Sequence, residues 1–174
     1  MSKNIREILL DFKAGETDAK IISYLALLTA FVAIATFLYI PGPSSSYFNL
    51  GEVAIYLIAI TFGQKVGAIT GALGSSLVDI ILGYSIWAPF TLVIKGLEGW
   101  VVGKIARENN ILSKILAILV GGHIMIFGYA ITKGFLISWA AVFTEIGINY
   151  AQVIIGAVVA IPLSRQIKRY FDTK

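Results

Sequence analysis

The stretch Val142–Leu163, VFTEIGINYAQVIIGAVVAIPL, decides the fold because it is long and apolar enough to cross a lipid bilayer as one helix. Its few polar residues are regularly spaced. Glu145, Asn149 and Gln152 are spaced i, i+4 and i+7, which places them on one face of a helix. Because this polar face fades after Gln152, the pattern favours a binding cup, open at one end and closed below, over a continuous pore.

The rest of the chain has a similar composition. Of its 174 residues 57% are hydrophobic and 14% are charged, against about 25% charged in soluble domains. The mean hydropathy of +0.84 leaves too little polar surface for a water-soluble protein. We therefore predict an all-α membrane protein in which residues 1–174 form a single transmembrane domain of six helices. The expected spans are Ile21–Ile40, Leu50–Phe62, Val66–Leu82, Ile86–Gly103, Leu112–Thr132 and Val142–Leu163.

The second expected span is short, so we expect it to be tilted or buried by its neighbours. The expected connections are Pro41–Asn49, Gly63–Lys65, Gly83–Ser85, Lys104–Ile111 and Lys133–Ala141. Residues 1–20 mix basic and acidic side chains without an apolar run, which predicts a cytoplasmic leader or amphipathic helix and not a signal peptide. Residues 164–174 read as a basic cytoplasmic tail.

The basic residues predict the orientation in the membrane. Of the 14 Lys and Arg residues, Lys95 lies within a span and Lys133 falls on one side. The other twelve fall on the opposite side, which the positive-inside rule makes cytoplasmic, together with both termini. They are Lys3, Arg6, Lys13, Lys20, Lys65, Lys104, Arg107, Lys114, Arg165, Lys168, Arg169 and Lys174. The pI of about 9.3 therefore follows topology, and we expect lipids as neighbours and no nucleic-acid partner.

Small residues recur four positions apart, a spacing that lets membrane helices approach closely. For most of them we expect packing inside the bundle. These are Gly63, Gly67 and Gly71, then Gly99 and Gly103, then Gly156 and Ala160. For Ala26 and Ala30 in the first span we expect a docking face for another membrane protein.

Ionisable groups inside a bilayer cost about 2.5–3.5 kcal/mol each on insertion scales, so they are candidates for function. In or at the ends of spans the chain has Glu52, Asp79, Lys95, Glu98 and Glu145. The topology places Asn49 and Glu52 at the outer end, Asp79 about one turn below the outer surface and Lys95 near the middle.

Structural pairing is the alternative for each polar candidate. Lys95 would pair with Glu98 or with Asp79, and Glu145 with Lys133 at the outer rim. The amides of Asn149 and Gln152 would then join neighbouring helices.

The aromatic residues concentrate in the outer half, where an interfacial belt explains many of them. Tyr47, Tyr84 and Trp87 lie close to the polar groups, where their rings would stack on a planar ligand. All four arginines are assigned to the cytoplasmic side, so no outer guanidinium awaits a phosphate. We infer a ligand that is planar, mostly uncharged and not phosphorylated.

Signatures of enzymes, metals and cofactors are missing from the sequence. There is no cysteine, and His123 stands alone on an apolar span, where we expect a satisfied core histidine. The run GAITGALGSS at 67–76 lacks the lysine of a phosphate-binding loop, and no GxSxG motif makes Ser75 a nucleophile. We expect no enzyme, no cofactor and no metal, so any ATP hydrolysis needs another chain.

Several runs together resemble the substrate-binding S components of energy-coupling factor (ECF) vitamin importers, in the riboflavin-type branch that includes hydroxymethylpyrimidine binders. These runs are YFNLGE at 47–52, the glycine-rich stretch 62–79, APFTLVIKGLEG at 88–99 and QVIIGAVVAIP at 152–162. Each motif is moderately specific by itself. Their order over residues 21–169 carries the resemblance.

The resemblance implies a six-helix binder in a prokaryotic cell membrane, with a vitamin pocket near the outer surface. Pro41–Phe48 would be its lid. A transmembrane coupling subunit and two ATPases would be its partners, and Ala26 and Ala30 match the contact with the coupling subunit. The bound vitamin, a transported substrate, would be riboflavin, or next a hydroxymethylpyrimidine, pyridoxine-type or other small vitamin. The expected ligand contacts are Asn49, Asp79, Tyr84, Trp87, Lys95, Glu145, Asn149 and Gln152.

Two other functions are weighed against this one. A stand-alone secondary transporter would use Asp79, Lys95 and Glu145 as a proton or ion relay, but the halves of the sequence show no convincing inverted repeat. An intramembrane enzyme would need Ser75 or His123 as a reacting group, and the missing motifs disfavour it.

Overall fold

The computed structural model describes residues 5–12, 18–42, 46–107 and 110–172. Expectations that concern Lys3, Lys13, Lys174 or positions 43–45 of the expected lid lie outside these residues. Seven α-helices, two short strands and one 3-10 turn make up the described chain. They are α1 Ile5–Asp11, α2 Ala19–Phe37, β1 Tyr39–Pro41, β2 Tyr47–Asn49, α3 Gly51–Phe62, α4 Gln64–Ile81, α5 Ala88–Ile105, α6 Ile111–Leu136, η1 Trp139–Ala141 and α7 Val142–Asp172.

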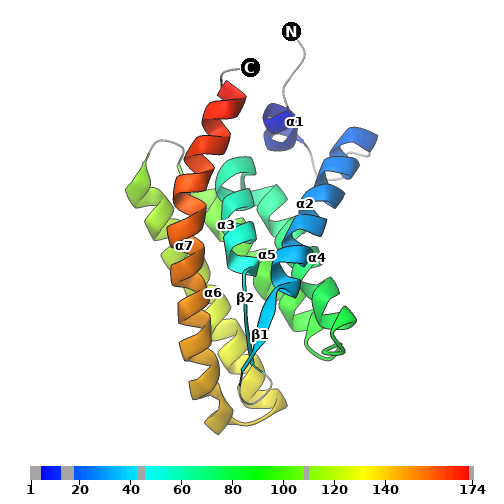
Figure 1. Cartoon of the computed structure of the whole chain (residues 1–174), viewed down its shortest axis with the longest axis vertical. Coiled ribbons are helices and arrows are strands. Elements are labelled where there is room, and N and C mark those ends of the chain that lie inside the picture. Colours follow the sequence, from blue (N-terminus) through cyan, green and yellow to red (C-terminus); the bar gives the residue numbers. More distant parts are fainter. Residues whose placement is uncertain (1–4, 13–17, 43–45, 108–109, 173–174) are drawn as a thin grey trace.

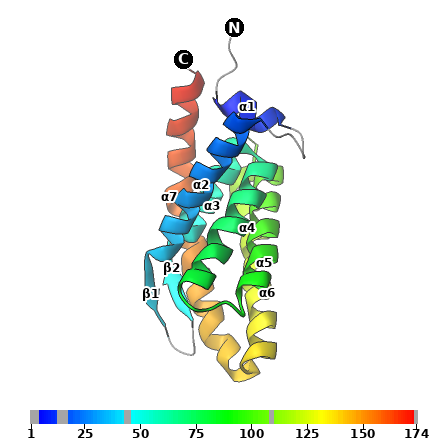
Figure 2. The ribbon, with the colours of Figure 1, turned by 90° about the vertical axis from the view of Figure 1, so that its right-hand side faces the viewer.

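The long helices form an elongated bundle, with α6 and α7 as its longest members (Figures 1 and 2). Helix α1 lies at the end of the bundle where α7 finishes. The β1–β2 hairpin and the turn between α6 and α7 lie toward the opposite end. We call these the terminal end and the hairpin end. The described parts of both chain ends therefore lie on the same side of the bundle.

Helix α3 is the centre of the bundle, because it packs against α2, α4, α5 and α7. Nearly all of its residues are buried, including the whole run from Ala54 to Thr61. This burial confirms the expectation that the short second span is covered by its neighbours. Gly63 ends the helix with φ +85°, a backbone conformation that favours glycine, and α4 begins at the next residue. The expected turn Gly63–Lys65 is thus a single-residue turn.

The expected spans agree with helices α2–α7, with four corrections at their ends. Helix α7 continues past the expected Leu163 to Asp172. Ile40 is not helical, because α2 stops at Phe37 and Tyr39–Pro41 forms a strand. β1 pairs antiparallel with β2, matching Tyr39 with Asn49 and Pro41 with Tyr47. Pro41 lacks the N–H that would continue a helix, which favours an extended edge strand. The sequence analysis missed this hairpin.

The other two corrections concern α5 and α6. Helix α5 begins at Ala88, two residues later than expected, with Pro89 in its first turn, where a missing N–H costs nothing. Helix α6 continues to Leu136, so Lys133 belongs to a helix and is fully buried. It had been assigned to an outer connection.

Glycines allow the closest helix contacts. A Cβ added to Gly99 of α5 would lie 2.3 Å from the carbonyl oxygen of Gly67 in α4, and one on Gly156 of α7 would meet the Tyr56 ring at 2.9 Å. These distances confirm internal packing for Gly67, Gly99 and Gly156. By contrast, Ala26 and Ala30 are exposed on α2.

Three of the described helices are long and apolar enough to cross a membrane: Ala19–Phe37, Ile111–Leu136 and the segment Trp139–Phe171. Large apolar side chains point outward from the bundle, among them Phe135 and Phe143, which are 79% and 80% exposed. Such a surface suits lipid and is rare on soluble proteins. Helices α4 and α5 carry three of the buried charged residues of the described bundle, Asp79, Lys95 and Glu98.

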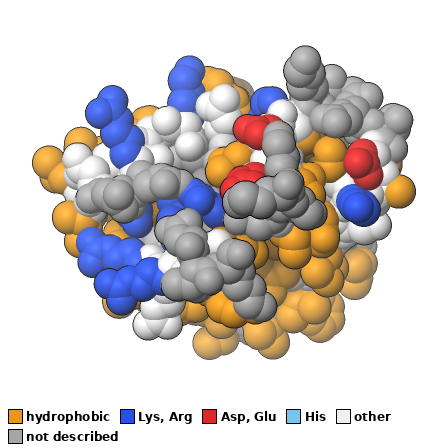
Figure 3. All heavy atoms as spheres, turned by 90° about the horizontal axis from the view of Figure 1, so that it is seen from above, with side chains coloured by type: hydrophobic (Ala, Val, Ile, Leu, Met, Phe, Trp, Pro, Cys, Tyr) orange, Lys and Arg blue, Asp and Glu red, His pale blue; other side chains and the backbone are white. Residues whose placement is uncertain are grey.

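The terminal end is the basic end of the molecule. Lys and Arg side chains gather on one part of this face in the view from above (Figure 3). Lys65 lies at the start of α4, Lys104 at the end of α5 and Lys114 at the start of α6. This gathering is the pattern that the charge count predicts for a cytoplasmic face.

Candidate functional site

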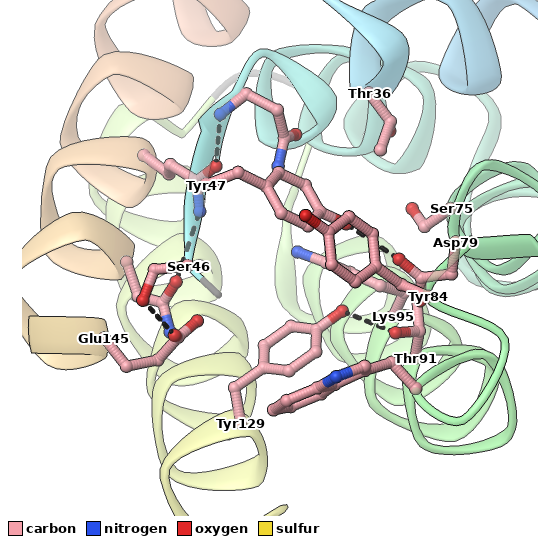
Figure 4. Close-up of a pocket in the computed structure, with 14 residues that line it drawn as sticks. Thr36, Ser46, Tyr47, Ser75, Asp79, Tyr84, Thr91, Lys95, Tyr129 and Glu145 are labelled. Carbon is pink, nitrogen blue, oxygen red and sulfur yellow. Dashed lines mark hydrogen bonds between the residues drawn. The ribbon is translucent and has the colours of Figure 1, made fainter. Parts of the chain in front are cut away.

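One cavity brings together all eight residues that the sequence analysis selected. Its empty space measures about 540 Å³, including the open part at its mouth. Helices α2, α4, α5, α6 and α7 and strand β2 contribute to its wall (Figure 4). The lining residues are Thr36, Ser46, Tyr47, Asn49, Ser75, Asp79, Tyr84, Trp87, Thr91, Lys95, Tyr129, Glu145, Asn149 and Gln152.

The polar face of α7 lines one side of the cavity, as its spacing predicts. Gln152 Oε1 accepts a hydrogen bond from the backbone N–H of Asn49 at 2.6 Å. Gln152 Nε2 donates to Asn149 Oδ1 at 3.3 Å. The Gln152 amide therefore holds strand β2 against α7. The hydrogen bonds of the two amides to described residues do not join two helices, which the alternative expectation required.

An ion pair closes the rim of the cavity. Lys133 Nζ lies 2.6 Å from Glu145 Oε2, which confirms the pairing alternative for these two residues. Ser46, in the chain just before β2, donates to the same oxygen at 2.8 Å and accepts from Lys133 Nζ at 2.5 Å. Because Lys133 is fully buried, this contact ties the hairpin to α6 and α7 in a place shielded from water.

Lys95, which lines the cavity, belongs to a buried ionic cluster. Lys95 on α5 forms salt bridges with Glu52 on α3 and with Glu98, whose Oε2 lies 3.0 Å away. Tyr56 donates to the other Glu98 oxygen at 2.7 Å. All four side chains are buried.

The contacts of Lys95 decide between the alternatives left open by the sequence. Pairing with Glu98 is confirmed, whereas the salt bridges of Lys95 do not include Asp79. Glu52 lies in the first turn of α3, the end of the span at which it was expected, and the packing of α3 against α5 brings it to Lys95. The ion pairs of Lys95 and of Glu145 are thus separate, and no described hydrogen bond or salt bridge joins Asp79, Lys95 and Glu145 to one another.

Aromatic rings form the opposite wall. Tyr47 and Tyr84 stack at 5.8 Å with an interplanar angle of 26°, and Trp87 lies 6.5 Å from Tyr129. The Tyr47 hydroxyl donates to Asp79 Oδ1 at 2.8 Å. Burial, together with the nearby Asp79 charge, raises the pKa of Tyr47 above its ordinary value, so the phenol keeps the proton that it donates.

Four buried polar atoms in the wall have no hydrogen-bond partner among the described residues. They belong to α2, α4 and α7: Thr36 Oγ1, Ser75 Oγ, Asp79 Oδ2 and Asn149 Nδ2. An unsatisfied buried polar group costs about 1–3 kcal/mol, and native proteins contain few of them. Together these atoms offer a carboxylate acceptor, an amide donor and two hydroxyls to a ligand.

The structure adds residues that the sequence analysis did not select, although spacing held a signal for several. Thr91 follows Trp87 by four residues and precedes Lys95 by four, so these three share a helix face. Ser75 stands in the same relation to Asp79. The remaining additions are Thr36, Ser46, Tyr47 and Tyr129, of which Tyr47 had been noted as a ring near the polar groups.

His123 was expected to be a satisfied core histidine; it is satisfied, but it lies outside the core. Its Nδ1 contacts the Leu119 carbonyl oxygen at 2.7 Å and its Nε2 contacts the Tyr150 hydroxyl at 3.3 Å, so the ring has partners. It is half-buried on α6 and does not belong to the core. The described residues contain no group of three His, Cys, Asp or Glu that would hold a metal ion.

Comparison with known proteins gives consistent matches. A family model described as "ECF-type riboflavin transporter, S component" matches residues 16–169. A thiamine precursor transporter, HmpT, of Lactococcus lactis subsp. cremoris (strain MG1363) is 32% identical over 155 residues, which cover 87% of this chain and 90% of that protein. A protein of Pyrococcus woesei, described as an uncharacterized protein in gap 3'region, is 45% identical over 101 residues, or 56% of this chain and 68% of that protein.

Proposed function

The chain belongs to the riboflavin-type family of ECF transporter S components, and on that premise we propose that the cavity at its hairpin end is a vitamin-binding site. As a member of this family it is a multi-pass component of a prokaryotic membrane that serves vitamin uptake and is not an enzyme. The four unpartnered polar atoms in the cavity wall carry the proposal, because a ligand would supply their missing hydrogen bonds.

The cavity favours a flat, unphosphorylated ligand. Tyr84, Trp87 and Tyr129 present ring faces on which a heteroaromatic ring would stack. No arginine lines the cavity, and the ammonium of Lys95 is already bound by two carboxylates. A phosphate would therefore meet no uncompensated cation, whereas ring nitrogens and carbonyls would meet Asp79 and Asn149.

Riboflavin is the first proposed ligand. Its ring system presents both donors and acceptors at one edge, matching the carboxylate of Asp79 and the amide of Asn149. The description of the matching family supports this choice. The eight ligand contacts expected from the sequence would bind it, together with Thr36 and Ser75, which also line the cavity.

Hydroxymethylpyrimidine is the second candidate, favoured by the likeness to a thiamine precursor transporter over most of the chain. Its exocyclic amine would donate to Asp79 Oδ2, the free acceptor of the cavity. Because this ring is smaller than that of riboflavin, the side chains of Tyr47 and Tyr84 would fill more of the cavity.

Titration of the purified full chain tests the site. Riboflavin binding is followed by quenching of flavin fluorescence, and hydroxymethylpyrimidine binding by calorimetry. Asn149→Ala should weaken the binding of the true ligand by about tenfold, because one buried hydrogen bond is lost. Gln166→Ala, at an exposed position farther along the same helix, should leave binding unchanged. Equal affinity of wild type and Asn149→Ala for both compounds would remove the proposed site.

We also propose the finer topology. Helices α2–α7 would be six membrane-spanning segments of one domain, with the terminal end in the cytoplasm. The common position of the described chain ends and the basic side chains of that end support this orientation (Figures 1 and 3).

The proposed partners are the transmembrane coupling subunit and two ATPases of an ECF transporter, with Ala26 and Ala30 at the contact. Both alanines are exposed on α2, where small side chains let a partner helix approach closely. Ala26→Leu should impair co-purification of the coupling subunit and spare vitamin binding. Ala140→Leu, an exposed alanine near the hairpin end, is the matched control. Normal assembly of the Ala26→Leu variant would contradict the docking contact.

A further inference from the structure

An apolar groove runs along the outer surface of the bundle between α4 and α5, two helices that lie side by side (Figure 2). It measures about 1050 Å³, including the space that opens to the surroundings. The groove shares no lining residue with the cavity, so it is a separate feature of the described surface. Its lining residues are Ala68, Ile69, Ala72 and Leu73 on α4 and Leu92, Val93, Gly96, Leu97 and Trp100 on α5.

Small residues hollow out the groove. Ala68 and Ala72 are one turn apart on α4. Gly96 of α5 lies opposite, where an added Cβ would be 3.3 Å from the Ala72 Cβ. Larger side chains in the same lining, Leu73 on α4 and Leu97 on α5, are exposed and form its sides. Such an apolar slot suits a hydrocarbon chain, which gains many small van der Waals contacts from a surface that it can lie in.

A cation lies at one end of the groove. Trp100 lines the groove toward the terminal end of α5, and the exposed Lys104 follows one turn later on the same helix face. The Lys104 Nζ lies 4.3 Å from the centre of the Trp100 ring, which is a cation–π contact. Tryptophan and lysine are typical of the level at which lipid head groups meet the hydrocarbon. The groove therefore ends where a lipid has its head group.

We propose that the α4–α5 groove binds an anionic phospholipid, with one acyl chain over Ala72 and Gly96 and the phosphate at the Lys104 ammonium. The apolar lining matches the chain, and the charge at its end matches an anionic head group. An apolar helix of another protein would match the lining and leave this cation unmatched. The inference rests on α4 and α5 spanning the membrane, as proposed above, and is independent of the vitamin that fills the cavity.

Native mass spectrometry of the delipidated full chain in neutral detergent tests the chain contact. The probes are phosphatidylglycerol and phosphatidylcholine with identical acyl chains. Ala72→Phe fills the groove and should weaken the binding of both lipids by about fivefold or more, because the acyl chain loses its packing contacts. Val120→Phe places the same ring in another groove, of about 900 Å³ on α6, and is the matched control. It should change the binding by less than about twofold.

The same measurement tests the head-group contact. Wild type should bind phosphatidylglycerol about fivefold more tightly than phosphatidylcholine, the effect expected of one lysine near an anionic lipid. Lys104→Met should abolish this preference and leave phosphatidylcholine binding unchanged. Lys20→Met removes an exposed lysine from α2 at the same end of the bundle and should keep the preference. A preference that survives in Lys104→Met would overturn the proposed head-group contact.

Two further results would overturn the lipid site. Equal weakening by Ala72→Phe and Val120→Phe would show that lipids coat the surface without choosing this groove. Unchanged lipid binding by Ala72→Phe, with loss of the co-purified coupling subunit, would assign the groove to a partner helix. Thermal unfolding shows whether each variant is folded, and Ala68→Leu, a smaller change in the same lining, repeats the test if Ala72→Phe is not.

Discussion

The buried lysines at the two ends of the bundle differ in their contacts. Toward the hairpin end, Lys133 meets Glu145 and Lys95 meets Glu52 and Glu98. At the terminal end, Lys114 contacts the Ser164 hydroxyl and forms no salt bridge with the described residues. The cavity region thus balances its own charge, and its unpartnered atoms are polar groups suited to an uncharged vitamin. The terminal end has cations in excess, which suits an anionic surface or ligand.

The largest expected effect is the difference in stability between two variants, each of which replaces a buried lysine with methionine, one near the cavity and one at the terminal end. Lys95→Met leaves two carboxylates buried without their cation and should destabilise the protein by about 3–5 kcal/mol. Lys114→Met removes a charge that forms no salt bridge with the described residues and should leave stability unchanged or raise it. Thermal unfolding in phosphate-free neutral detergent, followed by tryptophan fluorescence, measures both. Equal destabilisation by the two substitutions would erase the difference between the ends.

The next largest effect on stability is expected at the close contact between α4 and α5. Gly99→Ala places a Cβ against the Gly67 carbonyl oxygen and should cost about 1–3 kcal/mol, because α4 and α5 must move apart. Gly147→Ala is the control, since no atom lies within 4 Å of its added Cβ. The control should be neutral or slightly stabilising, as alanine favours helices. A fully stable Gly99→Ala variant would show that this contact is loose.

The smallest effect is expected at the rim. Ser46→Ala removes the hydrogen bond to Glu145 and the one accepted from Lys133, and it leaves the Lys133–Glu145 pair in place. A loss of about 0.5–1.5 kcal/mol would speed vitamin release by roughly two- to tenfold in stopped-flow measurements. Ser23→Ala, which removes only an exposed bond within α2, should have no effect on release. Unchanged release from Ser46→Ala would mean that the hairpin does not hold the ligand.

Much of the candidate site could be predicted from the spacing of polar residues along one helix. The i, i+4, i+7 pattern of Glu145, Asn149 and Gln152 placed them on one face, and the structure puts that face in the cavity wall. The depth assigned to the charged residues likewise brought Asp79 and Lys95 toward the same region. Periodicity within a helix is a local property, so a single sequence reveals it.

Contacts between different helices could not be predicted from the sequence in the same way. The partnership of Glu52 with Lys95 depends on α3 occupying the centre of the bundle, which no local pattern reports. Thr36 lies on an apolar helix, where a hydroxyl commonly bonds its own backbone and gives no sign of facing a cavity. The hairpin was missed because Tyr39 and Ile40 continue the apolar run of the first span, and apolar runs do not distinguish a helix end from a short strand.

Mass spectrometry of small molecules extracted from the purified chain tests most directly whether the cavity at the hairpin end holds a vitamin. Wild type, prepared from cells supplied with both candidate compounds, should carry riboflavin or hydroxymethylpyrimidine in near-equimolar amount. Asn149→Leu, shown by thermal unfolding to be folded, should carry neither. A wild-type protein without any such ring compound, or a variant that retains it in full, would contradict the account.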